Sequence, residues 1–449
     1  MKNTIWTGDV FTMRLYGASH DGHIGCILSN FPKGVVVDKK YIDHFVRRRA
    51  PGNFYGSGRR EPDHYEFVSG VVEGVTTGEE IDIRIVNQDV RKSDYEKMRY
   101  LLRPSHGDYA SYVKYNKIDS GGGVFSGRMT ASLVVVGALC DLYLKSQGIL
   151  TAAHLAQIGT IEDAKTDDMA ITTELMHRLN QAHLPFIDTT KELAVQKLIE
   201  QLREEKDATG GEIQIFMTGL QAGAGGELFG NLECKIAGLC YAVPGVKSVS
   251  FGLGEQFKGA RSSEVNDEFY YDEHQNIKTY TNFNGGILGG VTTGMPLVVS
   301  CVMKPTPSIG KTQRTVNVQT KTNTTISIQG RHDVCIALRG LWVLRACLCI
   351  AVADTLMAMQ TEEASLEDMR KEIDEIDGMM AELFNCRMNL SAKIGKLKQK
   401  NRQNIKDDNR EKVVLQRVMA RLEEQNKPYG AAYIEKIMEL SRRKQEEEL

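Results

Sequence analysis

The sequence predicts a two-domain protein, in which an α+β domain over residues 1–357 is followed by an all-α domain of three helices over residues 366–449. A chain of 449 residues exceeds the usual size of a single core, which rarely passes about 300 residues. In the first part, short β-branched runs alternate with glycine clusters and helical stretches. In the last part, glycine is rare and apolar residues recur with helical spacing. We expect residues 358–365 to be the linker.

Composition and charge restrict the class of protein. A hydrophobic content of 41% with 25% charged residues is typical of a soluble globular protein. The formal net charge of −2 gives no overall attraction to nucleic acid or to an anionic membrane, so we expect neither as a partner. The nine cysteines show no spacing of a metal site or disulfide framework, which favours reduced thiols, no metal and a cytoplasmic location.

Neither the N-terminal segment nor the longest apolar run near the middle of the chain predicts a secretory signal or a membrane span. The N-terminal residues lack the apolar stretch of a secretory signal. The apolar run 341–357 contains Arg345 and Asp354 and is too short to span a bilayer, so it predicts a buried helix.

In the α+β domain, helical stretches are expected at 127–145 and 189–205, and three features suggest anion chemistry. Arginines cluster at 47–49 and again at 59–60. A glycine run at 121–123 precedes the first of these helices, whose N-terminal amides would suit an anion together with Ser126 and Arg128. His20, His106 and His332 lie in short polar segments. No GxxxxGK or GxGxxG motif follows a strand, so ordinary nucleotide-binding loops are unsupported.

These segments together resemble chorismate synthase. The motifs, in chain order, are GASH, RRRAPG, RREPD, RPSHGDY, GGGVFSGR, NGGILGGVTTGMP, KPTPSI, QRTV and GRHD. The resemblance implies a β-α-β sandwich and a 1,4-anti elimination of phosphate from 5-enolpyruvylshikimate 3-phosphate to give chorismate. It also implies non-covalent reduced FMN with no net redox change, and NADPH only indirectly, to reduce the flavin.

The resemblance also implies site residues. His20 would be the acid for the departing phosphate, His106 the acid toward the reduced flavin, and Asp333 the base that removes the substrate proton. The residues implied for substrate binding are Arg48, Arg103, Ser126, Arg128 and Arg331. Those implied for the flavin are Val124, Phe125, Ser126, Pro244, Gly245, Gly289, Lys304, Pro305, Thr306, Pro307, Ser308 and Arg331.

In the helical domain, an apolar stripe with spacings of three and four predicts a long helix over 366–398. Its members are Leu366, Met369, Ile373, Ile376, Met380, Leu383, Leu390, Ile394 and Leu397, and Arg387 occupies the interrupting position. Such a helix would be about 50 Å long, more than a small monomeric domain covers, so we expect a second copy as partner. Alone, Arg387 would fit a register-setting residue in a coiled coil.

Other polar residues join Arg387 in a candidate pocket. Lys398 returns to within about 20° of the direction of Arg387, whereas Arg370 is rotated by about 100° and would serve the partner's site in a dimer. A second helix is expected to begin with a capping box of Asp408 and Glu411, beside Arg410. A third helix, 431–446, places Ser441 and Gln445 on one face. Residues 361–449 carry 18 Lys and Arg against 19 Asp and Glu, which argues against a polyanion ligand.

Segment 366–446 resembles a chorismate mutase of the all-helical class. Five motifs follow one another along the chain. They are Leu366–Asp377, which contains Arg370; then Arg387; then the sequence IGKLK, which ends at Lys398; then the pattern DxxRE, formed by Asp407, Arg410 and Glu411; and last Ser441 with Gln445. The resemblance implies rearrangement of chorismate to prephenate, without a nucleophile, by restraint and charge stabilisation. It assigns Arg387 and Lys398 to a substrate carboxylate and the ether oxygen, and Arg370 to the partner's pocket. Asp407, Arg410, Glu411, Ser441 and Gln445 would complete the pocket.

Three hypotheses remain open from the sequence. The first is a bifunctional enzyme, expected as a homo-oligomer that dimerises through the helical domain and forms a tetramer through the synthase domain. The second is an active mutase on a catalytically impaired synthase scaffold, because the stretch 334–345 has Val334, Leu338 and Trp342 where the family has prolines, and Arg345 where it has Glu. The third is a helical adaptor on a metabolic domain that only binds partners.

Overall fold

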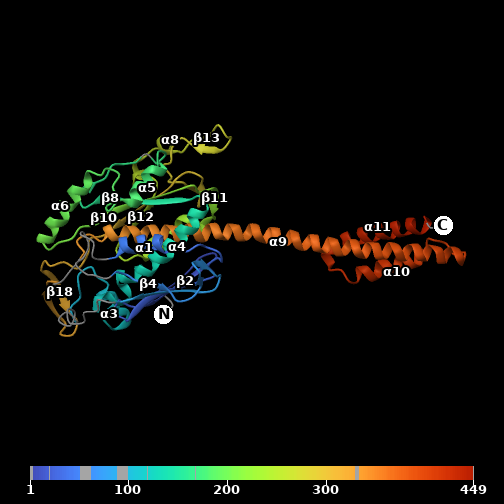
Figure 1. The fold of residues 1–449 in the computed structure, drawn as a ribbon, viewed down its shortest axis with the longest axis horizontal. Coiled ribbons are helices and arrows are strands. Elements are labelled where there is room, and N and C mark those ends of the chain that lie inside the picture. The colour runs from blue at the N-terminus through green and yellow to red at the C-terminus, as the bar shows by residue number, and fades with distance from the viewer. Residues whose placement is uncertain are drawn as a thin grey trace. The chain divides into compact units, whose positions relative to one another are not determined.

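A computed structural model of the chain divides into two compact units, Met1–Gln360 and Thr361–Leu449 (Figure 1). Each unit is described by itself. The structure describes residues 4–19, 21–50, 62–87, 100–118, 120–166, 168–328 and 333–447.

The first unit contains an antiparallel five-stranded sheet in the order β1-β2-β3-β7-β4. Its strands alternate between a buried and a more exposed face, as Ile81, Ile83 and Ile85 show, because successive side chains of a strand point to opposite faces. The strands are β1 (Ile5–Thr7), β2 (Thr12–Gly17), β3 (His23–Ser29), β4 (Tyr65–Phe67) and β7 (Ile81–Val86), and a small hairpin pairs β5 (Val71–Val72) with β6 (Val75–Thr76).

A second antiparallel five-stranded sheet has the order β12-β17-β10-β8-β9. Its strands are β8 (Leu150–Ile158), β9 (Ile161–Glu162), β10 (Gly211–Thr218), β12 (Val246–Phe251) and β17 (Leu297–Met303). Smaller sheets pair β11 (Ala222–Gly225), β16 (Val291–Thr293) and β15 (Ile287–Leu288), then β13 (Phe269–Tyr271) with β14 (Ile277–Thr279), and β18 (Gln313–Asn317) with β19 (Thr322–Ile326).

A helical layer lies between the two large sheets (Figure 1). Helix α4 (Thr130–Ser146) is buried along most of its length and contacts β3 and β7 of one sheet and β8 of the other. Helices α1 (Lys39–Arg49) and α9 (Ala337–Lys400) pack beside it; a Cβ atom at Gly137 of α4 would lie only 2.2 Å from Cβ of Ala346. One hydrophobic core joins both sheets and these helices, so the α+β sandwich predicted from the sequence is confirmed.

The remaining helices of this unit lie in the connections between its strands. The predicted helical stretches correspond to the 3-10 helix η3 (Gly127–Met129) with α4, and to α6 (Lys191–Glu204). The others are α3 (Asp108–Tyr115), α5 (Thr173–Gln181), α7 (Leu232–Ala242), α8 (Ser262–Val265) and the 3-10 helices η2 (Ser120–Phe125), η4 (Leu228–Gly230) and η5 (Gly254–Gly259).

Two helical segments, Gly127–Ser146 and Ala337–Gln360, are long and apolar enough to cross a membrane. They are 83% and 94% buried inside the protein, which is the behaviour of core helices, as predicted for the run 341–357.

Arg345 and Asp354, the two charges in that apolar run, are both buried and both paired. The guanidinium of Arg345 donates to Asp141 at 2.8 Å and to Asn180 at 2.6 Å, and it stacks over Phe45 at 4.5 Å from the ring centroid. The carboxylate of Asp354 accepts backbone N–H groups of residues 9–11 and the ammonium of Lys235. Buried charges with such partners are compatible with a stable core.

The second unit consists of the C-terminal part of α9, α10 (Asp408–Met419), the 3-10 helix η6 (Glu424–Asn426) and α11 (Lys427–Glu446). The predicted capping residue was wrong by one position, because Asp407 has the extended backbone and its carboxylate accepts the N–H of Arg410 at 3.0 Å. Helix α11 begins at Lys427, earlier than predicted, with a proline in its first turn. Residues 358–365 are helical within α9, and this stretch contains no glycine or proline to interrupt it.

Candidate active sites

The first unit encloses a cavity of about 610 Å³. Its walls come from the end of α1, the loop before α3, the glycine segment η2–η3, the turn between α7 and β12, the segment after β17 and the start of α9. Most residues assigned to this site from the sequence line it: Arg103, His106, Val124, Phe125, Ser126, Arg128, Pro244, Gly245, Lys304, Thr306, Pro307, Ser308 and Asp333.

Three of the predicted residues do not line the cavity. Arg48 points elsewhere, donating to the carbonyl oxygens of Gln181 and Ala182 and lying over the ring of Trp342. Gly289 lies in the turn between β15 and β16 with a φ of +62°, and Pro305 lies outside the lining although both its neighbours belong to it. His20 and Arg331, also assigned from the sequence, are outside the described residues, as is His332.

Arg49 takes the place that the sequence analysis gave to Arg48. Consecutive residues of a helix point about 100° apart, so only one of these two arginines can face the cavity. The buried residues of α1 are Ile42, Phe45, Val46 and Arg49, a spacing of three, four and seven that marks one helical face. The helical phase of α1 was therefore the signal that identifies Arg49.

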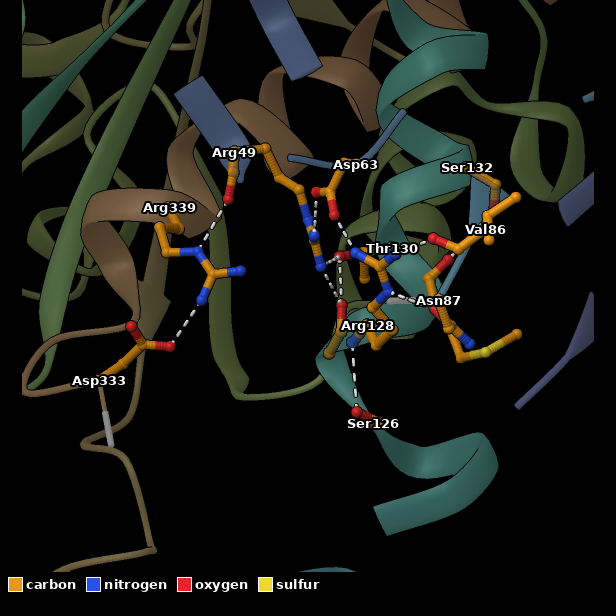
Figure 2. Close-up of polar contacts among 12 residues, drawn as sticks. Arg49, Asp63, Val86, Asn87, Ser126, Arg128, Thr130, Ser132, Asp333 and Arg339 are labelled. Carbon is orange, nitrogen blue, oxygen red and sulfur yellow. Dashed lines mark hydrogen bonds and ion pairs between the residues drawn. The ribbon is translucent and has the colours of Figure 1, made fainter. Parts of the chain in front are cut away.

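Arg49 and Arg128 share one buried carboxylate in the cavity wall (Figure 2). Arg49 donates to Oδ2 of Asp63 at 2.5 Å, and Arg128 donates to Oδ1 of the same side chain and, at 2.9 Å, to Asn87. The three charged side chains are at most 4% exposed. Two buried guanidinium groups therefore converge here, and both residues line the cavity, so this wall presents cationic groups that suit an anion.

Asp333 lies just before α9 and is held by Arg339, which also lines the cavity and was not singled out in the sequence (Figure 2). Nη1 of Arg339 is 2.7 Å from Oδ2 of Asp333, and its Nε donates to the carbonyl oxygen of Arg49 at 2.8 Å. Arg339 therefore connects the carboxylate of Asp333 both to α9 and to the end of α1.

The loop before α3 brings His106 and Arg103 into the cavity. Both side chains contact the carboxylate of Asp108, the first residue of α3. The ammonium of Lys304 donates to the carbonyl oxygen of Ser105 at 2.6 Å and so holds this loop from the other side. Burial lowers the pKa of Lys304, and the nearby charge of Lys247 adds to that effect.

Two glycines allow the backbone to pack closely against side chains that line the cavity. Gly122 has a φ of +91°, and a Cβ there would lie 3.2 Å from Cε1 of His106; Gly245 has a φ of +102°, and a Cβ there would lie 2.7 Å from Ile336. Only glycine adopts such conformations without strain. The hydroxyl of Thr306 is buried in the lining without a hydrogen-bond partner among the described residues, as expected of a group that meets a ligand.

In the second unit, two buried polar atoms lack partners among the described residues: Nε of Arg387 on α9 and Oε1 of Gln445 on α11. Gln445 and Ser441 lie on the buried face of α11. A Cβ at Gly395 would lie 2.8 Å from the carbonyl oxygen of Gln445, so the two helices approach closely at this point. Unsatisfied polar atoms inside a helical unit indicate a site for a polar ligand.

The other predicted residues of this unit have partners or are exposed. Lys398 donates to the carbonyl oxygen of Ile405 at 2.5 Å, and Glu411 is ion-paired with Arg442, a residue that the sequence analysis did not name. Asp407 caps α10, and the side chains of Arg370 and Arg410 are exposed.

Comparison with known proteins agrees with this geometry. Residues 11–357 match the family model for chorismate synthase, and residues 369–446 match the model for chorismate mutase type II. The chorismate synthase of Lancefieldella parvula is 35% identical over 369 residues, covering 79% of this chain and 97% of that protein. The chorismate synthase of Aeropyrum pernix is 36% identical, with coverages of 78% and 92%.

A solved chorismate synthase structure has the same fold as the first unit. Its TM-score is 0.64 at 24% identity, covering 82% of this chain and all of that chain. The chain therefore belongs to the chorismate synthase family and carries a chorismate mutase type II domain behind it, which makes it a bifunctional shikimate-pathway enzyme, both lyase and isomerase.

Proposed function

We propose that the cavity of the first unit eliminates phosphate from 5-enolpyruvylshikimate 3-phosphate by a 1,4-anti elimination, giving chorismate, and that the second unit rearranges chorismate to prephenate. One observation supports the first reaction. Arg49 and Arg128 line the same cavity as His106 and Asp333, so cationic side chains and proton-transfer groups face one space. A departing phosphate requires cations, and the accompanying C–H cleavage requires a base.

Different side chains are proposed to stabilise the departing phosphate and to transfer protons. The guanidinium groups of Arg49 and Arg128 are proposed to favour the dianionic phosphate as its C–O bond breaks. Asp333, fixed by Arg339, is the proposed acceptor of the substrate proton, and His106 is the proposed acid toward the cofactor. His20 is proposed as the acid for the departing phosphate.

The residues present fit reduced FMN as the cofactor. When bound, the reduced flavin supplies the electron-rich ring beside which the C–O and C–H bonds break without net redox change. Lys304 and Thr306 line the cavity, and the hydroxyl of Thr306, which has no partner among the described residues, together with the ammonium of Lys304 suits a polar, anionic cofactor. NADPH is proposed to act only indirectly, by reducing the flavin.

The rearrangement in the second unit needs orientation and charge rather than a nucleophile. The buried atoms of Arg387 and Gln445 that lack a partner among the described residues are the groups proposed to contact chorismate, together with Lys398 and Ser441. Orienting a flexible substrate and stabilising charge on the ether oxygen would both accelerate the reaction.

The proposed enzyme is a cytoplasmic homo-oligomer. The stripe on α9 remains unusually exposed for apolar side chains, at 39% to 69%, over Ile373, Ile376, Met380, Leu383, Leu390, Ile394 and Leu397. A second helical unit would cover it, and the exposed Arg370 would then serve the partner's pocket. We propose a tetramer through the synthase unit. The nine cysteines are unpaired, which fits a reducing compartment.

One experiment tests both reactions. The full chain is incubated anaerobically with reduced FMN and 5-enolpyruvylshikimate 3-phosphate, and phosphate, chorismate and prephenate are followed separately. Release of all three supports the bifunctional enzyme. Absence of phosphate, with prephenate still formed from added chorismate, would favour the alternative of an active mutase on an impaired synthase scaffold. The pairing of Arg345 with Asp141 supports the first outcome, since the altered stretch is accommodated in the core.

A further inference from the structure

We propose that Asp108 is a positioning residue that fixes one tautomer of His106 and one orientation of Arg103 inside the synthase cavity. The inference rests on the proposed elimination reaction, because it concerns how the acid of that reaction is held.

The carboxylate of Asp108 is 2% exposed and collects four donors from a single loop. Oδ2 accepts the backbone N–H of Arg103 at 3.1 Å and its Nε at 2.7 Å. Oδ1 accepts Nη2 of Arg103 at 2.7 Å and lies 2.8 Å from Nδ1 of His106. One buried side chain therefore sets the geometry of two residues that line the cavity.

Because an ionised carboxylate only accepts hydrogen bonds, Nδ1 of His106 must carry a proton. Burial alone would raise the pKa of Asp108, but the hydrogen bonds from Arg103 and His106 outweigh burial and hold that pKa well below its ordinary value. Asp108 is thus ionised at any working pH. Nε2, on the other side of the ring, is left for the cavity and has no hydrogen-bond partner among the described residues.

The opposite side of the imidazole is confined as well. A Cβ on Gly122 would lie 3.2 Å from Cε1 and 3.6 Å from Nε2 of His106, so the glycine segment packs directly against this edge of the ring. With Asp108 behind Nδ1 and Gly122 beside Nε2, the ring has one available orientation.

A simpler role for Asp108 is also conceivable, as an acidic residue in the first turn of α3 that pairs with Arg103 only for stability. The two roles differ in their effect on the histidine. Asn at position 108 has one acceptor oxygen, and at the Oδ2 position this oxygen keeps two donors of Arg103, so that only Nη2 of Arg103 loses its acceptor; the opposite orientation would set the NH₂ group against both of those donors. The favoured orientation turns the NH₂ group toward Nδ1 of His106. Nδ1 would then have to accept, and the proton would move to Nε2.

The test measures this tautomer directly. The full-length protein is labelled with ¹⁵N-histidine, and the imidazole signals of His106 are identified by their loss in His106→Gln. At a pH where the ring is neutral, we expect the proton on Nδ1 in the wild type and on Nε2 in Asp108→Asn. A wild-type ring protonated on Nε2, or an unchanged tautomer in Asp108→Asn, overturns the proposal.

Kinetics supply the second measurement. We expect kcat for phosphate release to fall about 100-fold in Asp108→Asn, the size of a typical acid–base contribution, and to recover partly in Asp108→Glu. Prephenate formation from added chorismate should be unchanged, which shows that the second unit is intact, and unchanged imidazole signals of the other histidines, all of which lie in the first unit, show that this unit is folded. A kcat for phosphate release within threefold of wild type would overturn the proposal.

The chain offers a matched control. Asp163 and His154 form a second buried pair, with Oδ2 2.8 Å from Nδ1, and neither residue lines the cavity. Asp163→Asn removes an equivalent contact, and we expect phosphate release to stay within threefold of wild type; an equal loss in both variants would reduce Asp108 to a structural role. If the wild type releases no phosphate, the proposed elimination fails, whereas the tautomer measurement still decides the role of Asp108.

Discussion

Arg339 connects Asp333 to the end of α1, since a single guanidinium donates to the carboxylate of Asp333 at 2.7 Å and to the carbonyl oxygen of Arg49 at 2.8 Å. The proposed base of the elimination therefore depends on a residue one turn into α9.

We predict that Arg339→Met lowers kcat for phosphate release by about 10- to 100-fold, because a small displacement of a reacting group has a large effect on rate. Arg339→Lys should retain part of the rate, as it can still donate to Asp333. Anaerobic phosphate release measures both variants, and Arg314→Met on the exposed side of β18 is the control. Wild-type kcat in Arg339→Met would contradict the role given to this contact.

Arg49→Met should raise KM for 5-enolpyruvylshikimate 3-phosphate about 10-fold or more, since the cavity wall loses one of its two buried guanidinium groups. The matched control is Arg47→Met, which alters an arginine on the same helix whose side chain is 75% exposed. Steady-state kinetics over a range of substrate concentrations separate KM from kcat. Equal effects of the two substitutions would show that the general charge of α1 matters, and not the buried wall.

Arg345→Met should destabilise the first unit by about 3 kcal/mol or more, because it leaves Asp141 charged and buried. Adding Asp141→Asn should recover part of that loss. Denaturant unfolding of the three proteins gives the free energies. A near-neutral Arg345→Met would mean that the ion pair contributes little to the stability of the core.

The difference in stability between wild type and Asp108→Asn should depend on pH. The pKa of Asp108 is lower in the folded chain than in the unfolded chain, so its contribution is fully present above the ordinary aspartate pKa of about 4 and is lost as the pH falls toward the folded value. Urea unfolding at several pH values between 6 and 3 should show the gap between the two proteins narrowing below about pH 4. A constant gap would contradict the low pKa.

Arg387→Ala should reduce prephenate formation by at least about 100-fold while chorismate formation continues. Arg417→Ala, on the exposed surface of α10, should leave both activities unchanged. Separate assays with added chorismate and with 5-enolpyruvylshikimate 3-phosphate make the comparison. Persistent prephenate formation in Arg387→Ala would place the mutase pocket elsewhere.

Features that depend on neighbouring residues were predictable from the sequence. The buried apolar helix and the three C-terminal helices followed from local patterns, the sandwich followed from the resemblance to chorismate synthase, and most motif residues line the cavity. Contacts across long sequence separations were not predictable. Asp63 meets Arg128 across 65 positions, and Asp141 meets Arg345 across 204, and no local pattern encodes such pairs.

Choosing between adjacent residues was the other source of error. The resemblance to chorismate synthase implied Arg48, whereas the helical phase of α1 turns Arg49 into the cavity wall. Asp408 was predicted as the cap in place of Asp407, because two consecutive aspartates are equivalent as caps until the backbone of each is known. In both cases the structure has a residue of the predicted type at the neighbouring position.

Helix α9 supplies Arg339 and Gly340 to the synthase cavity and contains Arg387 and Lys398 of the proposed mutase pocket. The two enzymes are therefore joined by a helix and not by a loop. A recombination breakpoint anywhere between Ala337 and Lys400 would fall inside this helix. Exchange of either enzyme for another by gene shuffling would have to preserve helical sequence through the junction. The fusion is thus expected to be inherited as one gene, with the two activities present in equal copy number in every cell that makes it.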